Sequence, residues 1–177
     1  INSNGSRKEA TTGLDKDYIT HWSYGIGESL NLFVPGLFGG SNSEPIKKDA
    51  PIVKNMQRMF NISRKDAQQY AGQFMYWANQ PGVSGPAYIG AVVIFLFVLG
   101  IFMVKGPIKK WILIGGTLLL LLSWGKNLNF LTNFFIDYVP LYDKFRAVSS
   151  MQVIVELVVP ILAILGLYQF INNDDNK

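Results

Sequence analysis

The sequence contains no cysteine and only one histidine among its 177 residues. It can therefore form no disulfide bond and no thiolate metal site. No cluster of histidine and acidic residues has metal-ligand spacing, and no Ser–His–Asp arrangement can be recognised. No cofactor site is visible in the sequence, which leaves open whether a divalent cation takes part.

The first residues lack an initiator methionine and the basic and apolar regions of a signal peptide. The last residues, 172–177, follow directly on a long apolar run. We therefore expect the chain to be a piece of a larger membrane protein.

Charge is absent from the eighteen residues between Ala87 and Val104. An apolar run of about 18–20 residues can cross a ~30 Å hydrocarbon core as a helix. Two further apolar runs follow, 111–124 and 151–171. We predict an all-α membrane protein, a polytopic helical bundle fragment with three transmembrane helices (87–104, 111–124 and 151–171) and helical extracytoplasmic loops.

The lysines between the first two runs predict the orientation, because Lys and Arg in short loops favour the cytoplasmic side. Segment 105–110 carries three lysines and no acid, so we predict a cytoplasmic turn there. Segments 1–86 and 125–150 then lie outside the cytoplasm, and the tail 172–177 lies inside.

The net charge of +4 does not indicate a nucleic-acid partner. Nine Lys and Arg residues in segment 1–86 are offset by seven Asp and Glu residues, so no basic face stands out. We predict the lipid bilayer as partner and no nucleic acid.

The outer segment 1–86 combines an aromatic loop with a helical part. Residues 18–43 are aromatic and rich in glycine, which is typical of a loop packed against other structure. Residues 49–79 are predicted to be mainly helical, with Ser63 and Asp66 forming a capping box.

The second outer segment, 125–150, carries apolar and aromatic residues at steps of three and four. This spacing predicts an amphipathic helix that is kinked or broken at Pro140. We expect it to lie along the membrane surface or against the end of the bundle.

Three stretches together resemble one family of membrane proteins. They are YITHWSYGIGESLNLFVPGLFGGS (18–41), QPGVSGPAYIGAVVIFLFVLG (80–100) and LLSWGKNLNFLTNFFIDYVPLYDKFRAVSSM (121–151). Their order and spacing are similar to those of YfhO-like bacterial membrane proteins, which are grouped with the GT-C glycosyltransferases. The segments WSYGIGE and LYDKFRA carry most of the specificity, and this chain reads KFRAVSSM where the family pattern would be KFRAPSM.

The resemblance implies a multi-pass protein of the bacterial cytoplasmic (inner) membrane. It implies transfer of a sugar from a polyprenyl-phosphate-linked donor to a glycan or lipid acceptor of the envelope, by an inverting displacement. Such enzymes usually carry the catalytic carboxylate in the first outer loop, which we expect to lie outside this chain. The alternative is a non-catalytic envelope transporter or assembly scaffold.

Four residues are candidates for binding the substrate. Arg146 and Lys144 precede the third apolar run on the predicted outer side, where a guanidinium can bind phosphate oxygens in a two-donor fork. Alternatively, both cations only anchor the chain to lipid headgroups. Trp22 and Tyr24 belong to the aromatic loop that would shape the sugar or acceptor pocket.

The catalytic residues are unknown at this point, and three ionisable side chains are weaker candidates. Glu28 could serve as a base or accept a sugar hydroxyl, or it could simply cap the glycine-rich turn. His21 could also take part, although a packed or surface role suits it equally. Glu156 is the ionisable residue inside a predicted span, where a carboxylate is costly and either functional or hydrogen-bonded to a neighbouring helix.

Overall fold

The helices and turns of the described residues are joined by loops, and the fold class is all-α. The computed structural model describes residues 13–42, 46–80, 82–83 and 85–172, so the predicted tail lies outside the described residues apart from its first position. Within these ranges one isolated backbone bridge, between Gly39 and Tyr76, has strand-like pairing. The elements are α1 (Lys16–Ile19), η1 (Gly27–Leu32), α2 (Pro51–Phe60), α3 (Arg64–Gln73), α4 (Ala91–Met103), α5 (Pro107–Ser123), η2 (Gly125–Leu128), α6 (Asn129–Tyr138), η3 (Tyr142–Lys144), η4 (Val148–Ser150) and α7 (Met151–Asn172).

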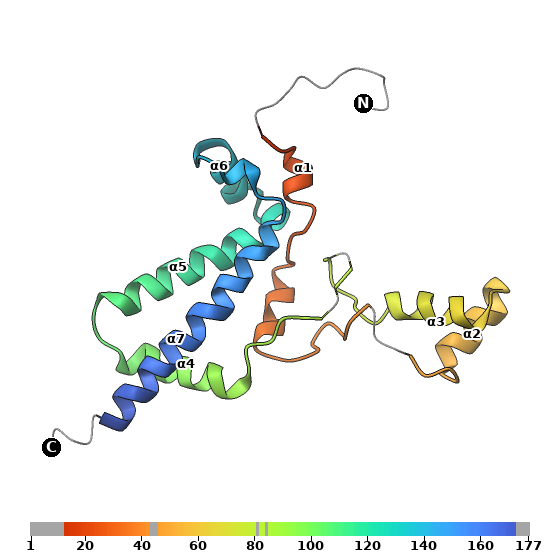
Figure 1. The fold of residues 1–177 in the computed structure, drawn as a ribbon, viewed down its shortest axis with the longest axis horizontal. Helices are drawn as coiled ribbons and strands as arrows, with labels where there is room; N and C mark the ends of the chain where they lie inside the picture. The colour runs from red at the N-terminus through yellow and green to blue at the C-terminus, as the bar shows by residue number, and fades with distance from the viewer. Residues whose placement is uncertain (1–12, 43–45, 81, 84, 173–177) are drawn as a thin grey trace.

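α7 packs against both α4 and α5, and the three helices form an apolar bundle (Figure 1). Val155 and Val159 of α7 are buried in it, with Phe97 of α4 and Leu120 of α5 packed against their cluster. α7 has 22 residues and is long and apolar enough to cross a membrane. At 1.5 Å per residue it measures about 33 Å. α4 and α5 have 13 and 17 residues and fall short of that length by themselves.

The uncharged run 87–104 is not helical over its whole length, which corrects the expected helix. α4 begins only at Ala91, since Gly90 has a φ of +106° that a right-handed helix does not accept. Just before it, the N–H of Ile89 donates to the carbonyl of Leu32. The start of the run is therefore extended chain bound to η1.

α5 begins at Pro107, inside the lysine-rich segment that was expected to be a turn. Proline suits the first turn of a helix because its missing N–H would have no partner there. The ammonium of Lys109 donates to the carbonyl of Ile101 at 3.1 Å. This lysine therefore covers one of the last four carbonyls of α4, which the helix itself leaves unpaired.

Two glycines let the backbones of α4 and α7 touch. A Cβ on Gly166 would lie 2.5 Å from the Cα of Gly100, and a Cβ on Gly100 would lie 2.5 Å from the carbonyl oxygen of Leu162. Small residues at a crossing are typical of helix pairs in membranes, where close backbone approach supplies much of the attraction.

α2 and α3 form a helical hairpin with an apolar core of its own, made of Val53, Ala67 and Ala71. Ser63 caps α3, because its hydroxyl accepts from the N–H of Asp66 and donates to the carboxylate of the same residue. The predicted cap at Ser63 is confirmed, and Asp66 is bound to it through the Ser63 hydroxyl.

The predicted helical segment 49–79 extends too far. α3 ends at Gln73, and the chain then pairs with the preceding loop, where the N–H of Gly40 donates to the carbonyl of Met75 at 2.9 Å. Backbone pairing with a distant segment replaces the helical bonds that the local pattern favoured.

α6 follows α5 across a bend of 110°. The chain leaves helical structure before Pro140, as predicted. The aromatic stripe divides: Leu131 and Phe135 pack against the core beside α5, whereas Phe130 and Tyr138 are 86% and 75% exposed. α6 thus covers the end of the bundle with one face and leaves aromatic rings on the other.

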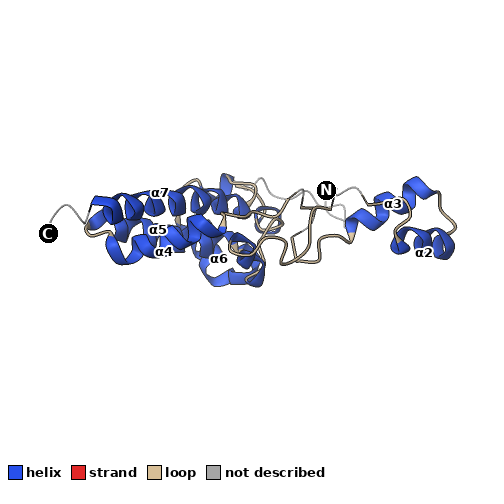
Figure 2. Cartoon of the chain, turned by 90° about the horizontal axis from the view of Figure 1, so that it is seen from below, coloured by secondary structure: helices blue, strands red, loops and turns tan. Residues whose placement is uncertain are grey.

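The molecule is elongated along the direction of the bundle helices. Figure 2 shows the bundle with the C-terminal end of α7 at one end, and the α2–α3 hairpin at the other. The loops around η1 lie between them.

The glycine contact between α4 and α7 predicts a clear stability difference. Gly166→Val should lower the free energy of unfolding by about 1–3 kcal/mol, because overpacking a tight contact has that cost. Gly115→Ala is the matched control, since its Cβ meets nothing within 4 Å. Thermal unfolding in detergent measures both, and equal melting temperatures for the two variants would contradict the close crossing.

Candidate functional site

The stretches around Trp22, Trp124 and Val148 meet at one point, the contact between Ser23 and Gly125. Gly125 has a φ of +44°, and a Cβ there would lie 2.1 Å from the Ser23 hydroxyl oxygen and 2.5 Å from a methyl of Val148. The Ser23 hydroxyl donates to the Thr20 carbonyl at 2.6 Å and accepts from the N–H of Lys126 at 3.0 Å. The aromatic loop is thereby bound to the corner between α5 and α6.

Trp22 and Tyr24, the predicted pocket residues, are held mainly through their backbones. The carbonyl of Trp22 accepts from the N–H of Ser149 at 3.1 Å, and the N–H of Tyr24 donates to Ser123 at 3.0 Å. The amide of Asn127 donates to the carbonyl of Tyr24 at 2.7 Å. Such paired backbone groups fix the loop rigidly at the end of the bundle.

Glu28 is buried, with 2% of its surface exposed. One carboxylate oxygen accepts from the N–H of Gly25 at 2.7 Å, and the other accepts from the hydroxyl of Tyr76. The capping role that the sequence left open for Glu28 is therefore present in the structure. The Tyr76 bond also binds the segment after α3 to η1.

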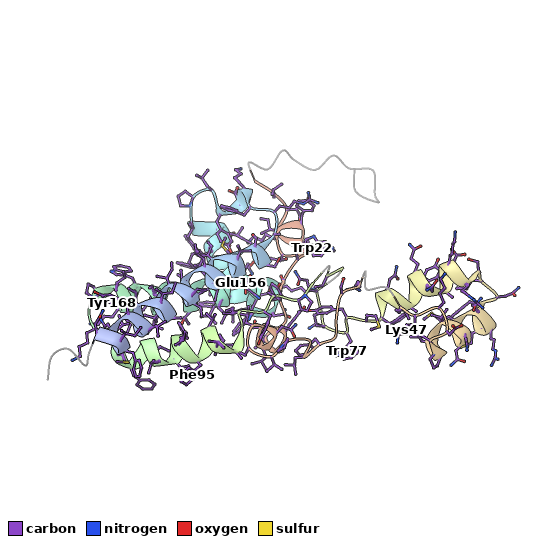
Figure 3. All side chains as sticks on the ribbon, turned by 60° about the horizontal axis from the view of Figure 1, so that its bottom comes forward. Trp22, Lys47, Trp77, Phe95, Glu156 and Tyr168 are labelled. Carbon is purple, nitrogen blue, oxygen red and sulfur yellow. The ribbon has the colours of Figure 1, made fainter. Side chains whose placement is uncertain are left out.

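Two tyrosine hydroxyls beside Glu28 resist ionisation. Burial raises the pKa of Tyr24 to about 12, with further contributions from the negative charges of Glu28 and Glu156. Burial and the hydrogen bond to Glu28 also raise the pKa of Tyr76 far above its ordinary value. The negative charges of both candidate carboxylates, Glu28 and Glu156, thus act on the Tyr24 hydroxyl. Figure 3 shows Glu156 on α7, toward the end of the bundle that bears the loops.

A pocket of about 150 Å³ opens beside Glu28, and its lining is mixed, because Ile26, Phe38 and Ala78 add apolar surface. It is named the polar pocket after Glu28 and Asn79. Trp77, 67% exposed, and Asn79 form one wall, and the Gly25–Glu28 turn forms another. An indole, an amide and a carboxylate around a small cavity are suited to a polar ligand with an apolar face, because the ring packs flat while the polar groups fix orientation.

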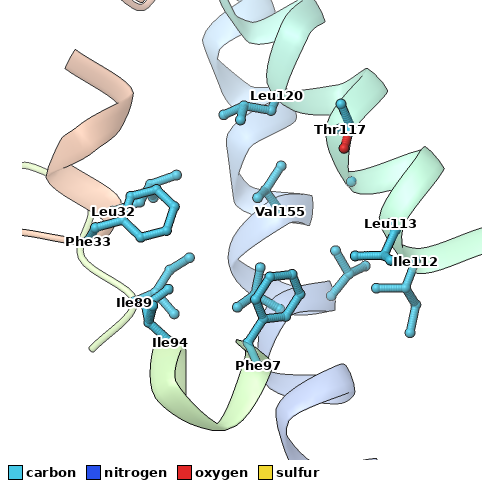
Figure 4. A pocket seen from close by; sticks show the side chains of 13 residues that line it. Leu32, Phe33, Ile89, Ile94, Phe97, Ile112, Leu113, Thr117, Leu120 and Val155 are labelled. Atoms are coloured by element: carbon cyan, nitrogen blue, oxygen red, sulfur yellow. The ribbon is translucent and has the colours of Figure 1, made fainter. Parts of the chain in front are cut away.

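A second cavity, of about 170 Å³, lies inside the bundle (Figure 4). Its walls come from α4, α5, α7 and the end of η1, and Thr117 is the one hydroxyl-bearing residue among otherwise apolar side chains and a glycine. The lining residues are Leu32, Phe33, Ile89, Ile94, Phe97, Ile112, Leu113, Gly116, Thr117, Leu120, Val155, Val158 and Val159. Such a lining accepts hydrocarbon and disfavours polar groups.

η1 lines both cavities. Gly27 and Glu28 at its start face the polar pocket, and Leu32 at its end faces the apolar one. With a rise of about 2 Å per residue, the two ends of this short helix are roughly 10 Å apart. A pocket with polar groups and an apolar cavity thus lie at the two ends of one short helix.

The predicted cations lie elsewhere. The guanidinium of Arg146 stands 5.4 Å above the ring centre of Tyr18, and the ammonium of Lys144 lies 3.2 Å from Asp143. Neither residue lines either cavity. His21 is exposed and packs edge-on against Trp22, with ring centres 5.6 Å apart. Among the described residues, no group of three or more metal-binding side chains gathers.

Sequence reasoning missed Tyr76, Trp77 and Asn79. The helical pattern of segment 49–79 assigned them to a helix, where they would not share a pocket. Their signal was weak: two adjacent aromatic residues and an amide just before Pro81-Gly82, a position where a chain leaves a helix.

The shifted pKa of Tyr24 predicts a measurable titration. Folding raises the pKa of Tyr24 from 10 to about 12. The contribution of this shift to the free energy of unfolding is therefore complete below pH 10 and is lost as the pH approaches 12. Tyr24→Phe should therefore remove tyrosinate absorbance that develops only near pH 12 in the folded protein. In denaturant the same difference should move to about pH 10, and a difference already complete at pH 10 in the folded protein would contradict the burial.

Comparison with known proteins adds no further assignment: no family model, no curated protein and no solved structure matches this chain.

Proposed function

We propose that this chain is part of a multi-span bacterial inner-membrane protein in which α7 crosses the bilayer by itself, and α4 and α5 cross it together with the residues that flank them. Only 28% of the most apolar window of α7 is buried, whereas the core helix of a soluble protein is mostly buried. A contiguous apolar surface of this kind needs a hydrophobic neighbour. Its exposed apolar residues on these helices are Val92, Phe95, Val98, Phe102, Ile108, Trp111, Ile114, Leu118, Val153, Ile154, Leu157, Ile161, Ile164, Leu167, Tyr168, Phe170 and Ile171.

The ligand that best suits the two cavities is a sugar linked to a polyprenyl phosphate. The observation that carries this proposal is the position of η1, which lines a polar pocket at one end and an apolar cavity at the other. The sugar would occupy the pocket of Trp77, Asn79 and Glu28. Part of the isoprenoid chain would occupy the cavity around Thr117, within the bundle.

The chemistry proposed is that of a YfhO-like glycosyltransferase. The acceptor hydroxyl, on an envelope glycan or lipid, attacks the anomeric carbon while the bond to the carrier phosphate breaks. Both oxygens of Glu28 already accept hydrogen bonds. This carboxylate is therefore assigned to positioning the sugar, and the base that takes the acceptor's proton is assigned to a part of the protein outside this chain.

One observation favours the alternative of a non-catalytic envelope transporter or scaffold. The hydrogen bonds of Glu28, Ser23 and Asn127 tie loops to helices and satisfy groups that an active site would need free. Under this alternative the polar pocket results only from the hydrogen bonds that hold the loops against the helices, and it has no affinity for a sugar.

Orientation can be tested by single cysteines, because the chain has none of its own. A cysteine at Ser63 or Asn133 should react with an impermeant reagent in intact cells, and one at Lys109 should react only after lysis. The reason is the excess of lysine around position 109. Labelling at 109 in intact cells, with none at 63, would reverse the proposed orientation.

The proposed binding of the sugar in the polar pocket predicts that one variant loses affinity for the sugar-bearing ligand alone. With the purified chain in nanodiscs, Trp77→Ala should weaken binding of farnesyl-phosphoryl-glucose by about 2- to 12-fold, the equivalent of roughly 0.5–1.5 kcal/mol for an aromatic contact. Binding of farnesyl phosphate, which lacks the sugar, should not change. Trp111→Ala is the control, since that indole is 75% exposed and lines neither cavity.

Three results would count against this assignment: no binding of the glucose probe, equal losses for both tryptophan variants, or equal losses for both ligands. The first would favour the scaffold alternative. The other two would show that Trp77 supports the fold and makes no contact with the sugar.

Arg146, the phosphate contact expected from the sequence, lies over the ring of Tyr18 and lines neither cavity, so it takes no part in this placement of the ligand. Arg146→Ala should therefore change the binding of both probes by less than about 2-fold. A loss of about 10- to 150-fold for both probes, the equivalent of a charged hydrogen bond of roughly 1.5–3 kcal/mol, would instead identify Arg146 as the phosphate contact and contradict the placement in the two cavities.

A further inference from the structure

The α2–α3 hairpin carries a hollow that the proposed function does not use. It is an open depression of about 440 Å³ lined by Lys54, Gln57, Arg58, Asn61 and Ile62. Two cationic side chains and two amides therefore face one small space. No carboxylate lines it.

The charges of segment 1–86 nearly balance as a whole, but positive charge is concentrated on this hairpin, which corrects the expectation that no basic face stands out. Residues 46–73 contain six Lys and Arg residues against two Asp residues, an excess of four that equals the net charge of the whole chain. One of the two acids, Asp66, is engaged by the Ser63 cap at the start of α3. The six cations are Lys47, Lys48, Lys54, Arg58, Arg64 and Lys65.

The geometry of α2 brings two of these cations together. Lys54 and Arg58 are four residues apart, so they lie on the same face of the helix one turn from each other. Both are exposed, and neither forms an ion pair among the described residues. Asn61 follows in the left-handed conformation (φ +49°), which ends α2 and turns the chain beside Arg58.

Such a set of donors recognises a phosphate group. Guanidinium binds two phosphate oxygens at once, ammonium adds a point charge, and the amides supply neutral donors. Repulsion between the two adjacent cations is relieved when an anion lies between them.

The position of the hairpin indicates where this phosphate comes from. The segment after α3 is bound to η1 through the Tyr76–Glu28 hydrogen bond, and the Asn42 amide donates to the carbonyl of Gln73 at 2.9 Å. The hairpin lies at the end of the molecule opposite the C-terminal end of α7 (Figure 2). It is therefore remote from the apolar bundle and from any lipid around it.

We propose that Lys54 and Arg58, with Gln57 and Asn61, bind a phosphate group carried by a soluble polyanion outside the membrane. The site is independent of the polar pocket, because no residue lines both. A phosphate-bearing polymer in solution would be held by the hairpin at a distance from the bilayer.

The test uses the whole chain in nanodiscs of neutral lipid, with short inorganic polyphosphate as the probe at fixed ionic strength. Lys54→Gln/Arg58→Gln should weaken binding by about 10-fold or more, since two charged contacts are lost. The control variant Arg64→Gln/Lys65→Gln removes the same charge from the same hairpin, at two residues that do not line the hollow. It should weaken binding less than about 3-fold. Far-UV circular dichroism confirms that each variant keeps its helices.

Equal losses for the two double variants would overturn the site and leave only diffuse attraction. Absence of polyphosphate binding by the parent chain would overturn it as well. A second arm uses free chain in detergent and vesicles with or without anionic lipid. Binding to anionic vesicles without binding to polyphosphate would overturn the soluble source and identify lipid headgroups.

Discussion

The buried carboxylate of Glu28 holds three parts of the chain in one arrangement. Its two oxygens accept from Gly25 in the aromatic loop and from Tyr76 after α3, while its own helix, η1, packs against α7 through Leu32. A buried charge is tolerated only when hydrogen bonds replace the lost water. The polar pocket and the root of the hairpin both depend on this one satisfied charge.

The bundle follows a different rule, because its outer surface is apolar. α4 and α7 approach through glycine backbones, and α5 completes the wall around a small cavity. In water such a surface would favour aggregation. In a bilayer it is solvated by lipid, and close packing at small residues holds the helices together. The exposed rings of Phe130 and Tyr138 on α6 suit the boundary between these two environments.

The proposed functions use two separate parts of this elongated shape, the loops in its middle and the hairpin at one end. The junction of η1 and the bundle has an apolar cavity and a polar pocket, into which the proposed lipid-linked sugar would place its chain and its sugar. The hairpin has two cations far from the bundle, and these would bind the proposed phosphate group of a soluble polyanion. One chain would thus combine a site for a membrane-bound donor with a surface that retains a soluble polyanion.

The sequence alone determined the helical class, the apolar runs, the Ser63 cap and the break at Pro140, because each depends on neighbours within one or two turns. It also named Glu28 and Glu156, since a carboxylate in an apolar or glycine-rich setting stands out by itself. Only the tertiary structure decided that Tyr76 meets Glu28 across 48 positions, that α3 ends at Gln73, and that η1 lines two cavities. Those features arise from pairing between distant segments, and a local pattern of hydrophobic and polar residues does not encode which distant partner a group will find.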